Sequence, residues 1–189
     1  MPPMTVYEVG KRITDINNNT SASSDCVSPT LLKLALPYII ESLTYIYNLS
    51  MDQNKFPSLL KIAKVKPIPK SGDLNDLNNY RPISLLSILS KPLERHIHKH
   101  MYKYLIENNL LNSSQSGFRP GHSCHTALIK MCDKWYASIN ESNVVGAVFL
   151  DLKKAFDLVN HDILMQKLAI YFAESEILPF LQSYLSNRK

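Results

Sequence analysis

The stretch VVGAVFLDLKKAFDLVNH, residues 144–161, decides the fold that we expect for this chain. It opens with a nearly unbroken apolar run from Val144 to Leu150, which follows a polar segment and ends at Asp151. A short apolar run of this kind is typical of a strand that is buried on both faces. A carboxylate at the end of such a strand must be solvated, paired or bound to a cation. We therefore predict a buried strand over 144–150.

Two side chains in this stretch are candidates for chemistry. Asp151 lies at the predicted strand end, and Phe156 follows five residues later. An acid at a strand end with an aromatic ring close behind is compatible with a corner that holds a metal ion and a nucleotide. Each residue also has an ordinary explanation, because an aspartate can cap a turn and a phenylalanine can pack in a core. The residues alone leave both explanations open.

Composition excludes several classes of protein. The chain has 189 residues, of which 45% are apolar, so it is long enough to bury a core. No apolar run approaches the roughly 18 residues of a transmembrane helix, and we expect no membrane partner. The first residues lack the apolar centre of a secretory signal. The three cysteines are irregularly spaced, which suits free thiols in a reducing compartment.

The net charge of +5 is concentrated in two basic clusters. The first lies between Lys55 and Lys70, and the second between Lys91 and Lys103. Clusters of this density can form an electrostatic footprint for nucleic acid. A solvated, lysine-rich surface explains them equally well.

Periodicity and turn signals predict a mixed α+β fold. Residues 1–27 carry little apolar content, and we expect them to be poorly ordered. We predict a cationic hairpin over 62–86, in which Lys64 and Lys66 alternate with small or apolar residues. We also predict helices over 28–49, 90–105, 123–139, 161–172 and 178–185.

Histidines and cysteines do not predict a metal site. The spacing of His122, Cys124, His125 and Cys132 is irregular and unlike that of zinc ligands. The alternation of histidines between residues 96 and 100 suits no single helix face. We also find no Ser-His-Asp arrangement and no phosphate-binding P-loop.

Several blocks of the sequence, taken together, resemble a known family. Their order and content are similar to the reverse transcriptase domain of non-LTR, LINE-type retrotransposons of the jockey kind, over about residues 28–189. The blocks are PSLLKIAKVKPIPKSGD (57–73), NNYRPISLLSILSKPLER (78–95), QSGFRPGHSCHTAL (115–128), VVGAVFLDLKKAFDLVNH (144–161) and the ending SYLSNRK (183–189). Any one block is a modest signal, but four in the family's order make chance similarity implausible.

The resemblance implies the N-terminal part of a right-hand polymerase. Residues 28–143 would form the fingers, and residues 144–189 would form the start of the palm. The family synthesises DNA on an RNA template from a DNA primer at a nicked target, using deoxynucleoside triphosphates. Mg²⁺ is its usual metal, with Mn²⁺ as an alternative. Family habit places assembly with RNA in the cytoplasm and reaction in the nucleus.

The resemblance also assigns roles to individual residues. Asp151 would be the catalytic carboxylate that bridges the metal ions, with the Leu152 carbonyl as a further ligand, because Mg²⁺ prefers oxygen donors. Phe156 would lie under the incoming sugar and exclude a 2′-hydroxyl. Arg81 and Lys70 would contact the triphosphate.

The block QSGFRPG (115–121) matches a family segment that lies near nucleotide and template. Arg119 would contact phosphate there or brace the fingers. A purely structural loop explains this block equally well.

The chain departs from the family pattern in its acidic residues. It contains no Asp-Asp pair, whereas the family's Tyr-x-Asp-Asp turn carries the other catalytic aspartates. We expect the chain to be truncated before this turn and the thumb. One carboxylate cannot hold two divalent ions that repel each other. We therefore expect this polypeptide alone to be inactive as a polymerase.

Three functions remain open at this point. The first is a fragment of a retrotransposon RNA-directed DNA polymerase. The second is a catalytically dead remnant that binds nucleic acid through its basic surface. The third is a fragment of a group II intron-type reverse transcriptase, although the wording RPISLLSILSKPLE (81–94) favours the LINE type.

Overall fold

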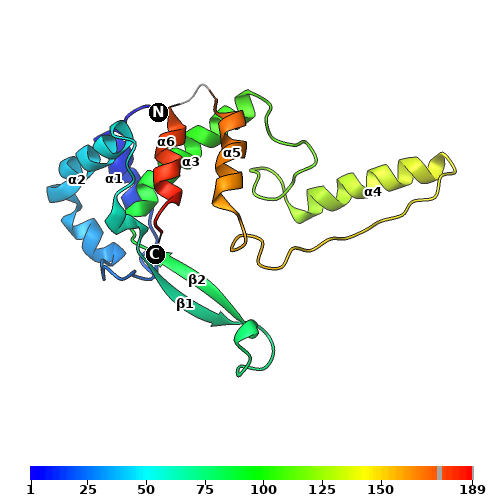
Figure 1. Ribbon diagram of the computed structural model, residues 1–189, viewed down its shortest axis with the longest axis horizontal. Helices are drawn as coiled ribbons and strands as arrows, with labels where there is room; N and C mark the ends of the chain where they lie inside the picture. Colours follow the sequence, from blue (N-terminus) through cyan, green and yellow to red (C-terminus); the bar gives the residue numbers. More distant parts are fainter. Residues whose placement is uncertain (174–175, 189) are drawn as a thin grey trace. The chain divides into compact units, whose positions relative to one another are not determined.

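The computed structural model describes residues 1–173 and 176–188, so Lys189 of the SYLSNRK block lies outside the described residues. The elements in chain order are helices, short 3₁₀ turns (η) and two strands (Figure 1): α1 Val6–Thr14, α2 Pro29–Asp52, η1 Ser58–Lys61, β1 Ala63–Pro69, η2 Leu77–Asn79, β2 Tyr80–Leu86, α3 Ser90–Glu107, α4 Cys124–Asn140, α5 His161–Tyr171 and α6 Ile177–Leu185. The described residues therefore contain the predicted mixture of helices and strands, with a single two-stranded antiparallel sheet.

The chain forms two compact units. Unit 1 consists of Met1–Lys103 and His161–Lys189, and unit 2 consists of Tyr104–Asn160. These limits differ from the predicted division at residue 143, which stays a prediction. All the buried apolar side chains of the described residues lie in unit 1. No described helix is both long and apolar enough to cross a membrane.

The N-terminal segment corrects one expectation. We predicted that residues 1–27 are poorly ordered, but α1 forms there and buries Val9 and Ile13. Its first turn has a capping box in which the Thr5 hydroxyl accepts from the Glu8 amide and the Glu8 carboxylate accepts from the Thr5 amide. Only one narrow face of α1 is apolar, so the average hydropathy of the segment is low. Average hydropathy therefore did not predict this helix.

A pair of hydrogen bonds fixes the chain before α1 to α2. The Met4 amide donates to Asn48 Oδ1 at 2.8 Å, and Asn48 Nδ2 donates to the Met4 carbonyl at 2.9 Å. α2 begins as predicted, with Ser28 as its N-cap and Pro29 in the first turn. It continues to Asp52, three residues past the predicted end at Leu49.

The predicted hairpin is present. β1 and β2 pair antiparallel in a register that places Ala63 opposite Leu86 and Pro69 opposite Tyr80. The connecting turn is closed by a backbone bond from the Lys70 amide to the Asn79 carbonyl, at 2.6 Å. Gly72 has a φ of 132°, a conformation that suits glycine and few other residues. The hairpin extends from the helices of unit 1 with both faces largely exposed (Figure 1).

The base of the hairpin is held by the C-terminal helix. Phe56 is buried and contacts Phe180 and Tyr184 of α6 edge to face, with ring centroids 5.9 and 4.9 Å apart. The Lys61 ammonium donates to the Ser183 carbonyl and, at 3.2 Å, to the Ser186 carbonyl. Since the last carbonyls of a helix lack partners within it, Lys61 satisfies the end of α6.

Unit 2 corrects the expectation that opened the sequence analysis. We predicted a buried strand over 144–150, but the segment has no regular secondary structure. Most of its side chains are exposed, for example 99% for Val144, 76% for Phe149 and 89% for Leu150, and Val145 is half-buried. A strand buried on both faces needs neighbouring strands and covering layers, and the described residues supply neither to this segment.

Candidate functional site

One face of the hairpin gathers cations. Opposed residues of an antiparallel pair point to the same face, and so do alternate residues along a strand. Ile68 is opposite Arg81, so Arg81 shares its face with Lys64 and Lys66. Lys70 continues the alternation at the end of β1, where its amide bonds to Asn79. We call Lys64, Lys66, Lys70 and Arg81 the cationic hairpin face, and all four are exposed.

The cationic hairpin face contains two residues that the sequence analysis did not name as site candidates. Lys64 and Lys66 lie opposite Leu85 and Ile83 in the ladder. The signal for them was present in the sequence, because their alternation with Ala63 and Val65 already placed them on one side of a strand. Four cations on one exposed surface attract a polyanion such as a triphosphate or a nucleic-acid backbone.

Arg119 is turned toward its own loop. Its Nη1 donates to the Asn112 carbonyl at 3.1 Å and to the Gln115 carbonyl at 3.4 Å. Its Nε is buried and has no hydrogen-bond partner among the described residues. Gln115 Nε2 in turn donates to the Gly117 carbonyl at 3.1 Å. The guanidinium therefore braces its own loop, and its contact with phosphate or its bracing of the fingers stays a prediction.

A ring contact joins two of the blocks that carried the resemblance. Phe118 and Phe156 lie edge to face, with centroids 5.7 Å apart and planes at 90°. Phe118 has a φ of 58°, a left-handed conformation that is unusual for an aromatic residue. Both rings are otherwise exposed, at 85% and 76%. Within unit 2, the loop over 115–121 and the segment after Asp151 thus meet at this pair.

Asp151 and Leu152 do not form a metal site by themselves. Both lie in the exposed segment without regular structure, and no hydrogen bond or ion pair is described for the Asp151 side chain. Among the described residues, no three side chains of histidine, cysteine, aspartate or glutamate are grouped to hold a metal ion. One carboxylate and one carbonyl cannot hold the two divalent ions that the resemblance implies, because the charges of the ions repel each other. The donor set described in this polypeptide therefore does not fit that pair of ions.

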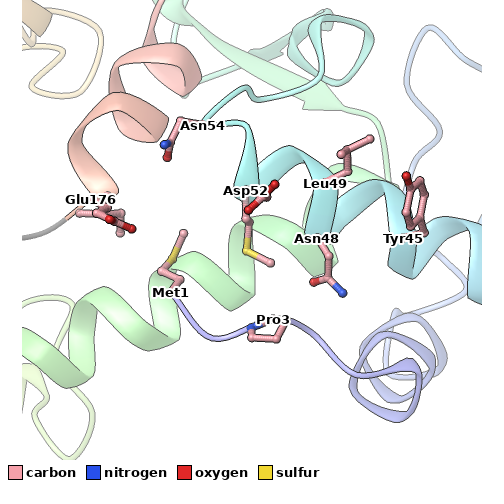
Figure 2. A pocket seen from close by; sticks show the side chains of 10 residues that line it. Met1, Pro3, Tyr45, Asn48, Leu49, Asp52, Asn54 and Glu176 are labelled. Atoms are coloured by element: carbon pink, nitrogen blue, oxygen red, sulfur yellow. The ribbon is translucent and has the colours of Figure 1, made fainter.

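Unit 1 contains a pocket that is separate from all of these residues. Figure 2 shows it between the N-terminal segment, the end of α2 and the start of α6, lined by Asn48, Leu49, Asp52 and Glu176 among others. Two carboxylates and several apolar side chains share the lining. The pocket contains none of the predicted site residues, and its lining does not assemble a nucleophile with a base.

Buried polar side chains of unit 1 were not found from the sequence. His96 is 1% exposed, and its Nε2 lies 3.0 Å from the Pro2 carbonyl, while its Nδ1 has no partner among the described residues. Burial lowers the pKa of His96. Burial also lowers the pKa of Lys61, with the nearby Arg188 charge adding to the effect. These groups fasten elements together, so we assign them structural roles.

Comparison with known proteins gives a consistent result. The model of the family described as reverse transcriptase (RNA-dependent DNA polymerase) matches residues 68–188. This range includes most of the hairpin, the loop over 115–121, Asp151 and α6.

Three of the most similar relatives are transposon proteins of fruit flies. The chain is 33% identical over 188 residues to the "Probable RNA-directed DNA polymerase from transposon BS" of Drosophila melanogaster, covering 99% of this chain and 21% of the relative. It is 28% identical to the corresponding protein of transposon X-element from the same species, covering 99% and 21%. It is 27% identical to the RNA-directed DNA polymerase from mobile element jockey of Drosophila funebris, covering 99% and 20%. The chain thus spans about a fifth of the length of these relatives.

Proposed function

This chain belongs to the reverse transcriptase family, and we propose that it contributes the nucleotide- and template-binding part of the RNA-directed DNA polymerase of a jockey-like, non-LTR retrotransposon. The observation that carries the proposal is the family match over 68–188 combined with the cationic hairpin face, of which Lys70 and Arg81 lie inside that range. Such a face is suited to a phosphate backbone or a triphosphate.

The fingers and the palm follow from the same proposal. Residues 28–143 act as the fingers, and residues 144–189 contribute the first part of the palm. Lys70 and Arg81 contact the triphosphate of the incoming deoxynucleotide, Arg81 as a bidentate donor and Lys70 as a point charge. The exposure of Lys70 and Arg81 on one hairpin face supports this assignment. The RNA template and the DNA primer are the other partners.

Unit 2 supplies the residues nearest the chemistry. Phe156 acts as the sugar gate, and its contact with Phe118 ties the gate to the loop that Arg119 braces. In the longer polymerase, Asp151 and the Leu152 carbonyl are two of the ligands of a catalytic Mg²⁺, with Mn²⁺ as an alternative. The ion would supply Lewis-acid stabilisation of phosphate charge. The remaining carboxylates would be supplied by other parts of the longer polymerase.

A second function is favoured by the isolation of Asp151. A polypeptide with one exposed carboxylate and a cationic face can bind nucleic acid without catalysing synthesis. We propose that this non-catalytic binding is what the 189 residues do when they act alone.

Primer extension distinguishes these two functions. The purified 189-residue polypeptide is incubated with a poly-A template, an oligo-dT primer, dTTP and either Mg²⁺ or Mn²⁺. We expect no extension, because the polypeptide lacks a complete metal site. Extension that the Asp151→Ala variant abolishes would contradict the second function and make the isolated polypeptide an enzyme.

RNA binding tests what the two functions share. We expect the polypeptide to bind RNA with an affinity that falls steeply with salt, and the Lys64→Glu/Lys66→Glu variant to bind at least about tenfold more weakly. A salt-independent affinity, or none, would refute both functions. Sequencing downstream of codon 189 adds an independent check, since an open frame with a Tyr-x-Asp-Asp turn supports the polymerase.

A further inference from the structure

The solvent face of α3 has a composition that the proposed function does not use. Lys91, Arg95, His98 and Tyr102 are spaced at i, i+4, i+7 and i+11, so they lie along one side of the helix. The opposite side of α3 is buried through residues that include Leu93, His96 and Ile97. We call Lys91, Arg95, His98 and Tyr102 the α3 face. All four belong to unit 1.

The two cations of the α3 face are not neutralised by neighbours. Among the described residues, no hydrogen bond or ion pair involves the side chain of Lys91 or Arg95. The adjacent carboxylate, Glu94, is engaged elsewhere: Tyr184 Oη donates to Glu94 Oε1 at 3.1 Å, and Arg188 lies 3.4 Å from the same oxygen. The α3 face therefore keeps a positive charge that can attract an anion.

Arg188 completes the neutralisation of Glu94. Its guanidinium lies 4.0 Å above the ring centroid of Tyr184, a cation–π arrangement that holds it beside the carboxylate. The positive charge of Arg95 consequently has no competing partner along this side of α3.

The aromatic half of the α3 face is ordered as a stack. The rings of His98 and Tyr102 are 5.7 Å apart at their centroids, with planes only 14° from parallel. His98 is exposed and Tyr102 is half-buried. A cationic track beside a stacked pair of flat rings is the combination that binds single strands, since phosphates contact the cations and unstacked bases stack on the rings.

We propose that the α3 face is a binding site for single-stranded nucleic acid, separate from the cationic hairpin face. Lys91 and Arg95, one helical turn apart, contact phosphates, and a base stacks on the His98–Tyr102 pair. A duplex cannot use the second contact, because its bases are already stacked. The inference rests on the proposed function only in taking nucleic acid as the partner.

Fluorescence anisotropy with a labelled oligouridylate and a duplex RNA of equal length tests the proposal in the full 189-residue chain. The Lys91→Ala/Arg95→Ala variant should bind the oligouridylate about tenfold more weakly. The slope of log K against log salt should fall by about 1.4, the value for two lost contacts on a single strand. The matched control is Lys134→Ala/Lys167→Ala, which removes two exposed helix lysines and the same charge. It should change the slope little.

Substitution of the ring separates stacking from charge. Tyr102→Leu should weaken oligouridylate binding about tenfold and leave duplex binding unchanged, whereas Tyr102→Phe should bind both as the wild type does. His98→Ala provides the same test if Tyr102→Leu fails to fold, which circular dichroism reveals.

Three outcomes overturn the proposal. If the α3 pair and the control pair lower affinity equally, the site is only diffuse charge. If the Tyr102→Leu and His98→Ala variants bind single strands normally, no base stacks there. If the wild type binds no RNA, the proposed function fails as well. The proposed function survives the first two outcomes when Lys64→Glu/Lys66→Glu still binds RNA at least about tenfold more weakly than the wild type.

Discussion

Units 1 and 2 contain helices with equally good local signals, but they differ in burial. α1 in unit 1 and α4 in unit 2 both begin with a capping box. α1 buries Val9 and Ile13, whereas none of the described side chains of α4 is buried. The cap determines where each helix begins, while packing depends on partners from distant parts of the chain.

The comparison matters because the candidate chemistry is divided between the units. Lys70 and Arg81 extend from a unit with a packed core, and their hairpin base is fixed by α6. Asp151 and Phe156 belong to unit 2, in which none of the described residues is buried. Precise positioning of reacting groups requires packed support. We therefore expect Lys70 and Arg81, the proposed triphosphate contacts in unit 1, to be better ordered than Asp151, the proposed catalytic residue in unit 2.

We expect the largest effect from removing the buried ring that packs between α6 and the hairpin base. Phe56→Ala should lower the free energy of unfolding of unit 1 by about 3–5 kcal/mol, because it removes a buried ring from between Phe180 and Tyr184. Urea unfolding followed by circular dichroism measures the loss. The control is Phe118→Ala, which removes an exposed ring from unit 2 and should cost far less. Equal losses would mean that the two units do not differ in packing.

The second-largest effect concerns Lys61, whose ammonium donates to carbonyls at the end of α6. Lys61→Met keeps the apolar stem but leaves the Ser183 and Ser186 carbonyls without their charged donor. We expect a loss of about 1–3 kcal/mol in the same unfolding experiment. Lys55→Met, at an exposed position nearby, should change stability by less than about 0.5 kcal/mol. A stable Lys61→Met protein would show that hydrophobic packing alone holds α6.

Removal of the two caps compares the units directly. Thr5→Ala should lower the unfolding free energy of unit 1 by about 1 kcal/mol, because α1 is coupled to the core. Ser123→Ala removes the equivalent cap from α4 and should instead reduce local helicity, without changing the unfolding midpoint of unit 1. Amide chemical shifts of α4 and a urea titration measure the two quantities. Coupled changes in both units would contradict their independence.

The smallest effect is a pH dependence confined to unit 1. Burial lowers the folded-state pKa of His96, and the facing charges of Arg12 and Lys99 add to this, while the Pro2 carbonyl and Glu8 act in the opposite direction. As the pH falls, His96 therefore takes up a proton in the unfolded chain before it does so in the folded chain. The contribution of His96 to the stability of unit 1 is fully present above about pH 6.5 and is lost as the pH drops below this value. Between pH 7.5 and 6 the loss is at most about 1 kcal/mol for one histidine.

Thermal melts at these two pH values, with His96→Gln as the comparison, measure the contribution. His100 also titrates with a pKa lowered by burial, so only the difference between wild type and variant belongs to His96. If the difference in melting temperature between the wild type and His96→Gln is the same at both pH values, His96 is not the group that makes stability depend on pH.

Much of the fold could be predicted, because local signals determine it. The alternation in β1, the turn residues after Lys70 and the Ser28-Pro29 start of α2 all lie within a few residues of what they specify. α1 could also have been found, since Thr5 and Glu8 have the spacing of a capping box. The strand over 144–150 was wrongly predicted because apolar character reports a preference for burial, which only distant partners can satisfy.

The site was predictable to the same extent. The sequence suggested that Lys70 and Arg81 share a hairpin, and that prediction needs only the register. Lys61 could not be recognised, because its partner Ser183 is 122 residues away and its own neighbours resemble an ordinary basic surface. The contact between Phe118 and Phe156 is likewise non-local and has no pattern in the sequence.

That ring contact also depends on the length of the chain between its two members. α4 has 17 residues, which carry the chain about 25 Å outward at the rise of a helix. The return path from Asn140 to Phe156 has 16 residues, which can span about 53 Å at the rise of an extended chain. The return path is therefore longer than the helix requires. An insertion of one helical turn in α4 lengthens the outward path by only about 5 Å, so the contact between Phe118 and Phe156 should tolerate it.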